Sequence, residues 1–145
     1  MAAVRTATVT WDGDLQNGQG SVSAGSGVFT DVAVSWPSRI EESGPTSPEE
    51  LLAAAHASCF AMAFSAGLAR HGTPPEHLHV EAEVTFDKIG EGWGVKSSHL
   101  TVLGHVDGIS AEDFEAAAQD AKDGCPISRA LKGNLEITVD ATLES

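Results

Sequence analysis

Apolar and polar residues alternate in several stretches of the chain, which is the pattern of β-strands with one buried face. In the first 36 residues, Val9 and Trp11 alternate with threonines, and Asn17-Gly18 supplies turn residues. We predict a small antiparallel sheet there. Residues 80–87, 95–106 and 135–143 show the same alternation, and a phase shift near Ser97-Ser98 indicates a bulge.

A helix start is clearly marked between these strand regions. In Ser47-Pro48-Glu49-Glu50, the serine can cap a helix, the proline suits its first turn and Glu50 can close a capping box. We predict a helix to about Arg70, ended by Gly72. Its middle is apolar on every face, so a sheet must cover one side and another surface the other. The preceding residues 37–45 are predicted to form a polar loop that holds Arg39.

A second helix is predicted from Ser110 to about Lys122, with Gly124 at its end. Cys125-Pro126 then begins a short helical segment to Leu131. A chain of 145 residues has the size of one ordinary domain, so we expect residues 1–145 to form a single domain.

The charge and the composition limit the functions that are possible. Eight basic and 21 acidic residues give a formal net charge of −13, which disfavours binding to nucleic acid or to anionic membranes. The N-terminus has no secretory signal pattern, and the alanine-rich run 51–69 is weakly hydrophobic for a membrane span. We therefore expect a cytoplasmic protein. In a reducing compartment, Cys59 and Cys125 are more plausibly redox-active or metal-binding than a permanent disulfide.

Four residues are candidates for chemistry, and each also has a purely structural interpretation. Cys59 lies among alanines in the long helix and could be a small buried hydrophobe, whereas Cys125 starts a helical turn, where the helix dipole stabilises a thiolate. A thiol in an apolar site needs a nearby cation to react, and Arg39 is the best-placed arginine, unless it is a solvated loop charge. Glu49 suits the first helical turn and could also orient Arg39 through a bidentate pair.

The spacing of Glu49 and Cys59 has a geometric consequence. Ten residues on one helix correspond to roughly 15 Å of axial rise, which is too far for both to share one small site. If both serve the same site, we expect an identical partner chain to supply one of them.

Other kinds of site have weaker support. His56, His77 and His79 raise the possibility of zinc or iron, but neither cysteine has a second cysteine within four residues, so no metal site is predicted. The chain also has no phosphate-binding loop, no nucleophile elbow and no dinucleotide fingerprint, so we predict no cofactor.

These motifs resemble those of the OsmC family (osmotically inducible protein C), which is close to the organic hydroperoxide resistance proteins. The resemblance rests on residues 48–60 (PEELLAAAHASCF), residues 124–128 (GCPIS) and the spacing between them. Residues 11–14 (WDGD), 18–20 (GQG) and 26–28 (SGV) also resemble the OsmC branch. The similarity covers nearly the whole chain.

The resemblance implies a cysteine-based peroxidase that reduces organic hydroperoxides and, less efficiently, hydrogen peroxide, and that protects against oxidative stress. By resemblance, Cys59 is the peroxidatic cysteine and Cys125 the resolving cysteine, Arg39 holds the thiolate, and Glu49 orients Arg39. The implied fold is α+β, with antiparallel sheets packed around the long helix, and the implied assembly is an intertwined homodimer. An external dithiol, of the lipoyl type in this family, reduces the Cys59–Cys125 disulfide. Two alternatives remain open: a module that binds a small hydrophobic ligand, and a redox sensor without turnover.

Overall fold

The structure, a computed structural model, describes residues 1–41 and 44–144. The chain divides into two compact units, residues 1–51 and 52–145, and each is described by itself. The predicted α+β class is confirmed, because the chain combines two three-stranded sheets with a long helix.

The first unit contains the predicted N-terminal antiparallel sheet. Strands β1 (Ala7–Asp12), β2 (Gln19–Ala24) and β3 (Val32–Val34) pair antiparallel in that order. Gly13 and Gly27 adopt φ of +95° and +79° in the two connections, a backbone conformation that favours glycine.

The predicted polar loop at residues 37–45 is wrong in its first part. Pro37–Ile40 form a helical turn, α1, and Arg39 lies on it. Proline has the φ that a first helical residue needs, and the Ser38 hydroxyl donates to the Ser35 carbonyl at 2.6 Å, which ties the turn to the preceding chain. Residues 42–43 of the predicted loop lie outside the described residues.

Helix α2 (Pro48–Arg70) has the predicted bounds. The Ser47 hydroxyl accepts the Glu50 backbone N–H at 3.0 Å, which is the predicted cap. The second half of the capping box differs, because the Glu50 carboxylate accepts the Thr46 hydroxyl at 2.7 Å instead. At the other end Gly72 has φ +86° and the Thr73 N–H donates to the Leu68 carbonyl at 3.0 Å, the geometry of a Schellman motif.

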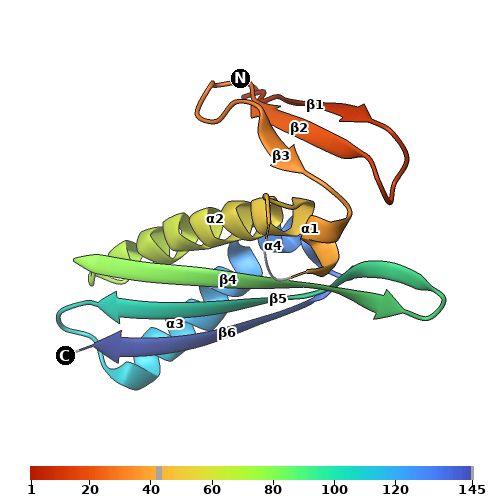
Figure 1. The fold of residues 1–145 in the computed structure, drawn as a ribbon. Helices are drawn as coiled ribbons and strands as arrows, with labels where there is room; N and C mark the ends of the chain where they lie inside the picture. Colours follow the sequence, from red (N-terminus) through yellow and green to blue (C-terminus); the bar gives the residue numbers. More distant parts are fainter. Residues whose placement is uncertain (42–43, 145) are drawn as a thin grey trace. The chain divides into compact units, whose positions relative to one another are not determined.

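The second unit is built on a mixed sheet with the order β4-β5-β6 (Figure 1). Strands β4 (His77–Ile89) and β5 (Gly92–His105) form an antiparallel hairpin. Their register passes from Thr85 opposite Ser97 to Phe86 opposite Val95, so Lys96 is the extra residue of a bulge, one position before the predicted phase shift.

The third strand of this sheet corrects the expectation that both sheets are antiparallel. Strand β6 (Glu136–Glu144) pairs parallel to β5. Helices α3 (Ala111–Gly124) and α4 (Pro126–Leu131) connect the two strands, and such a crossover is what a parallel pair requires. Helix α3 begins where predicted, and the Ser110 hydroxyl caps it by accepting the Asp113 N–H at 3.1 Å.

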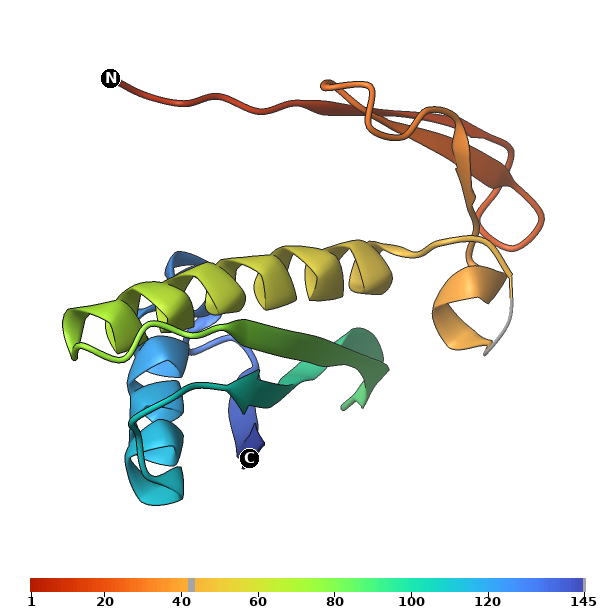
Figure 2. The ribbon, with the colours of Figure 1, turned by 90° about the vertical axis from the view of Figure 1, so that its left-hand side faces the viewer.

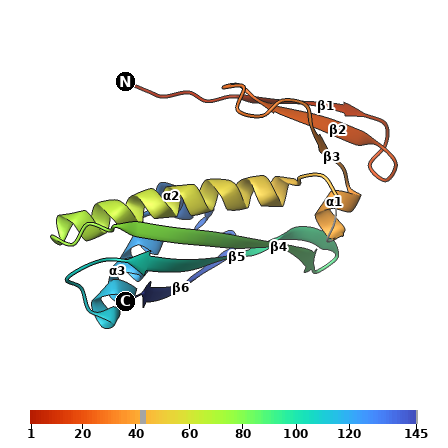
Figure 3. The same cartoon turned by 60° about the vertical axis from the view of Figure 1, so that its left-hand side comes forward.

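The core of the second unit lies between the sheet and one face of α2. Phe60, Phe64 and Leu68 recur every four residues along α2 and are completely buried. Helix α3 lies on the same side of the sheet and crosses α2, as Figures 2 and 3 show. The rings of Phe64 (α2) and Phe114 (α3) are 5.0 Å apart, so the two helices share one core.

A glycine in β5 makes room for one of these rings. A Cβ atom at Gly104 would lie 2.5 Å from the Phe114 ring, so any side chain at this position collides with the core.

Another part of the surface of α2 is exposed. Met62, on the side of α2 away from Phe60 and Phe64, is 71% exposed. By length and composition alone α2 could span a membrane, since an 18-residue window has mean hydropathy 1.6 and is 22% buried. Its packed face is that of a core helix, and the predicted absence of a membrane span stays a prediction.

Candidate active site

The two cysteines are brought together in the second unit. Cys59 projects from the middle of α2, and Cys125 is the residue between α3 and α4. Both are free thiols; Cys125 is completely buried and Cys59 is partly exposed. The two thiols are neighbours, close enough for Cys125 to act on the ionisation of Cys59. Residues far apart in the sequence therefore form one dithiol pair, in which only Cys59 is open to solvent.

The environment of Cys59 acts on its pKa in two directions. Burial raises the pKa of the Cys59 thiol above its usual value, and the neighbouring Cys125 raises it further. The backbone N–H of Ile127 and the positive charge of Arg129 lower it. Both of these residues belong to α4. The backbone dipole and the cation that favour the Cys59 thiolate therefore come from this one helix.

Sequence reasoning missed Arg129 as a residue that acts on Cys59. It preferred Arg39 because a loop before a helix can fold over that helix. Arg129 lies four residues after Cys125 in the short helix, and its N–H donates to the Cys125 carbonyl at 2.9 Å. The helical spacing from Cys125 was a signal that could have identified it.

Arg39 and Glu49 are joined within the first unit. Arg39 Nη2 donates to Glu49 Oε1 at 2.6 Å, and Arg39 Nε contacts both carboxylate oxygens, at 3.1 and 3.2 Å. The Glu49 side chain is 8% exposed and that of Arg39 is 30% exposed. Two nitrogens bound to one buried carboxylate fix the guanidinium plane, as predicted for this pair.

An apolar cavity of about 350 Å³ adjoins this ion pair in the first unit. It is lined by Val9, Trp11, Leu15, Val22, Val34, Ser35, Trp36, Arg39, Pro48 and Leu51. A mostly apolar cavity with a fixed guanidinium in its lining suits a molecule with an alkyl chain and a polar oxygen.

His56 is fully buried and has no free ring nitrogen. Its Nδ1 lies 2.6 Å from Ser98 Oγ of β5, and its Nε2 lies 2.8 Å from Ser128 Oγ of α4. Burial lowers the pKa of His56 below its usual value, so the ring is neutral at neutral pH. Coordination of a metal would break one of these bonds, so the geometry argues against His56 as a ligand.

The other histidines weighed as metal ligands lie elsewhere. His77 and His79 are exposed on β4. Within residues 1–41 and 44–144, Glu76, His105 and Asp107 have ligand-type atoms within 4.8 Å of one another at the surface. None of the residues predicted to carry chemistry belongs to this group.

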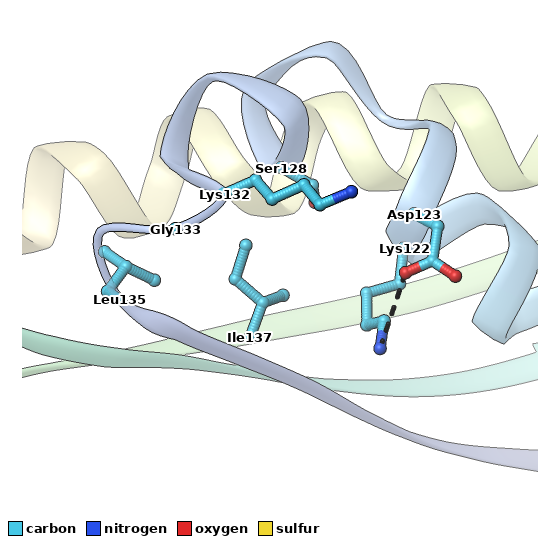
Figure 4. Close-up of a pocket in the computed structure, with 7 residues that line it drawn as sticks. All are labelled: Lys122, Asp123, Ser128, Lys132, Gly133, Leu135 and Ile137. Carbon is cyan, nitrogen blue, oxygen red and sulfur yellow. Dashed lines mark ion pairs between the residues drawn. The ribbon is translucent and has the colours of Figure 1, made fainter.

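A small cavity lies beside α4. It measures about 200 Å³ and is lined by residues of α3, by Ser128, by the chain after α4 and by Ile137 of β6 (Figure 4). Lys122 and Asp123, which line it, form an ion pair with a distance of 3.6 Å. Helix α4 is therefore incompletely packed on this side.

The paired thiols and the α+β fold define the class of two-cysteine thiol proteins, and the comparisons with known proteins specify the family. The family model described as OsmC-like protein matches residues 40–140. Peroxiredoxin OsmC of Escherichia coli (strain K12) is 41% identical over 135 residues, 93% of each chain. Organic hydroperoxide resistance protein OhrA of Bacillus subtilis (strain 168) is 36% identical over 101 residues, 66% of each chain.

A solved structure supports the same assignment. The organic hydroperoxide resistance protein OsmC from Legionella pneumophila has a TM-score of 0.72 and 25% identity, over 97% of this chain and 99% of that one. The chain belongs to the OsmC family.

Proposed function

We propose that this protein is a cysteine-based peroxidase that reduces organic hydroperoxides, and hydrogen peroxide less efficiently, in defence against oxidative stress. The observation that carries the proposal is the neighbouring pair of free thiols, Cys59 and Cys125, in which only Cys59 is open to solvent. The names of the relatives, peroxiredoxin OsmC and organic hydroperoxide resistance protein, support the substrate class.

The chemistry starts at the partly exposed sulfur. The Cys59 thiolate attacks the terminal oxygen of the hydroperoxide, the O–O bond breaks, and the alkoxide takes a proton and leaves as an alcohol. Cys59 is then a sulfenic acid. The Cys125 thiol attacks the Cys59 sulfur, a disulfide forms and water leaves. An external dithiol, for which we propose the lipoyl type, reduces the disulfide by exchange and becomes a disulfide itself.

Two cations are assigned complementary roles. Arg129, which acts on Cys59 within the second unit, favours the thiolate. Arg39, held flat by Glu49, is assigned to the thiolate and the peroxide oxygens, because its planar fork offers several donors. The neighbouring apolar cavity is assigned to the alkyl chain of the hydroperoxide.

The site residues support a homodimer as the working assembly. Glu49 and Cys59 are separated by roughly 15 Å along one helix axis, so a partner chain would complete the site. The open, apolar side of α2 around Met62 offers a surface for that partner. In this proposal residues 1–145 act as one domain in the cytoplasm, and the reaction uses no cofactor or metal.

The test is hydroperoxide consumption with a dithiol as reductant. The parent protein is expected to consume cumene hydroperoxide with a higher kcat/KM than hydrogen peroxide, and Cys59→Ser is expected to be inactive. Equal consumption by Cys59→Ser would refute the peroxidase function. A parent protein that binds alkyl compounds without turnover would favour the ligand-binding alternative.

A further inference from the structure

His56 and Cys59 lie three residues apart on α2, and so do Cys125 and Ser128 around the start of α4. Residues three apart on a helix lie on the same face. The His56–Ser128 hydrogen bond, with a distance of 2.8 Å, therefore runs beside the Cys59–Cys125 contact and joins the same two segments. The hydrogen bond and the sulfur contact are neighbouring links between α2 and α4.

The hydrogen bonds of His56 are well matched to a neutral ring. A neutral imidazole has one N–H donor and one acceptor nitrogen, and a serine hydroxyl can serve either. Ser98 and Ser128 are both buried, at 0% and 3% exposure. Ser98 is closed off from solvent, whereas Ser128 lines the cavity of Figure 4. Loss of either hydroxyl leaves a buried ring nitrogen without its partner.

The two serines differ in how firmly the element that carries each of them is fixed. Ser98 lies in the central strand of a three-stranded sheet, which is fixed by backbone bonds on both sides. Ser128 lies in a helix of six residues that borders the cavity of Figure 4. The hydrogen bond to His56 is therefore much more important for the placement of α4 than for that of β5.

We propose that His56 is a positioning residue for disulfide formation: through Ser128 it holds the start of α4 so that Cys125 faces Cys59. The proposal rests on the peroxidase function and adds a residue to it. The step that His56 supports is attack of the Cys125 thiol on the Cys59 sulfenic acid, with loss of water. His56 touches neither the peroxide nor the sulfurs in this step.

The experiment compares Ser128→Ala with Ser98→Ala, since each variant removes one hydroxyl from the same histidine. After one equivalent of cumene hydroperoxide, the decay of the Cys59 sulfenic acid is followed by dimedone trapping and mass spectrometry. Ser128→Ala is expected to slow disulfide formation about tenfold, which corresponds to about 1.4 kcal/mol. Ser98→Ala is expected to stay within about twofold of the parent, because it leaves the link to α4 in place.

A second measurement needs no peroxide. Equilibration with reduced and oxidised glutathione gives the effective concentration of the two thiols, which is expected to fall about tenfold in Ser128→Ala only. Ser128→Thr, which keeps the hydroxyl and adds a methyl beside the cavity, is expected to restore the parent value.

The outcomes separate the positioning role from the peroxidase function. Equal values for Ser128→Ala and Ser98→Ala, or no restoration by threonine, would overturn the positioning role and leave the peroxidase function intact. A parent protein that forms no sulfenic acid would refute the peroxidase function, while the glutathione equilibrium would still test the positioning.

Discussion

Arg39 and Glu49 form a two-point ion pair, in which Nη2 and Nε of the guanidinium both contact a carboxylate that is nearly buried. The contact fixes the position of the charge and also the plane of the guanidinium group. Because α1 carries the arginine and the first turn of α2 carries the glutamate, the pair also joins two consecutive elements.

Replacing either member of this pair is expected to lower catalytic efficiency. Arg39→Lys keeps the charge but loses the fork, and Glu49→Gln keeps the size but loses the ionic anchor. We expect kcat/KM for cumene hydroperoxide to fall about tenfold or more, as misplaced groups at a site typically cause. Arg5→Lys is the matched control, because Arg5 is exposed and its guanidinium donates to the carbonyl of its neighbour Val4. If Arg39→Lys has the kinetics of the parent protein, Arg39 is not part of the site.

Cys125→Ser is expected to survive one turnover and then become over-oxidised at Cys59. Without a second thiol the sulfenic acid persists and reacts with further peroxide to sulfinic acid. Intact-mass measurement after successive peroxide pulses should show two added oxygens on the variant and a disulfide in the parent. A variant that remains at the sulfenic state through many equivalents would argue against Cys125 as the resolving thiol.

Arg129→Gln is expected to raise the pKa of Cys59. The charge of Arg129 lowers this pKa, so its removal leaves the raising effect of burial less opposed. The rate of alkylation by iodoacetamide, measured against pH in a Cys125→Ser background, should shift to higher pH. Lys132→Gln, an exposed charge in the same segment, is the control and should not shift the profile. A profile unchanged by Arg129→Gln would exclude this electrostatic role.

The stability of the parent is expected to fall as the pH drops below about 6.5, the ordinary pKa of histidine. The pKa of buried His56 is lowered in the folded protein, so in this range the unfolded chain binds a proton that the folded one does not. Protonation therefore favours the unfolded state, by at most about 1.4 kcal/mol per pH unit for one group. Urea unfolding of His56→Gln should lack this part of the pH dependence. The same slope in both proteins would show that another group causes it.

The parent is expected to have the mass of a homodimer in light scattering. Met62→Glu places a charge on the exposed side of α2, away from the core, and should shift the mass toward the monomer. Circular dichroism serves as the control that α2 remains folded. A Met62→Glu protein with the parent mass would place the interface elsewhere.

The sequence was sufficient for the elements whose signals are local. Ser47, Pro48 and Gly72 bound α2 where the pattern placed it, because caps and terminators act on adjacent backbone groups. The direction in which β6 pairs with β5 could not be predicted from such local signals. Alternation tells which face of a strand is buried but not the direction of its neighbour.

The residues of the site likewise include some that the sequence predicted and some that it did not. The cysteine motifs and the Arg39–Glu49 pair were predictable from residue type and from the family resemblance. Ser98 and Ser128 were missed, because a serine gives no sign in the sequence that it will meet a buried histidine from another element. Arg129 was passed over although its spacing of four residues from Cys125 was a usable signal; the effect of its charge on Cys59 is seen in the folded chain.

The close approach of Phe114 to Gly104 sets a limit on how this protein can vary. The Phe114 ring occupies the space that a side chain at position 104 would need. The same ring packs on Phe64, which lies on the helix that carries Cys59. Random mutagenesis of position 104, followed by selection for survival under peroxide stress, should therefore recover glycine almost exclusively. A position that carries no reactive atom would then be under as strict a selection as the sulfur itself.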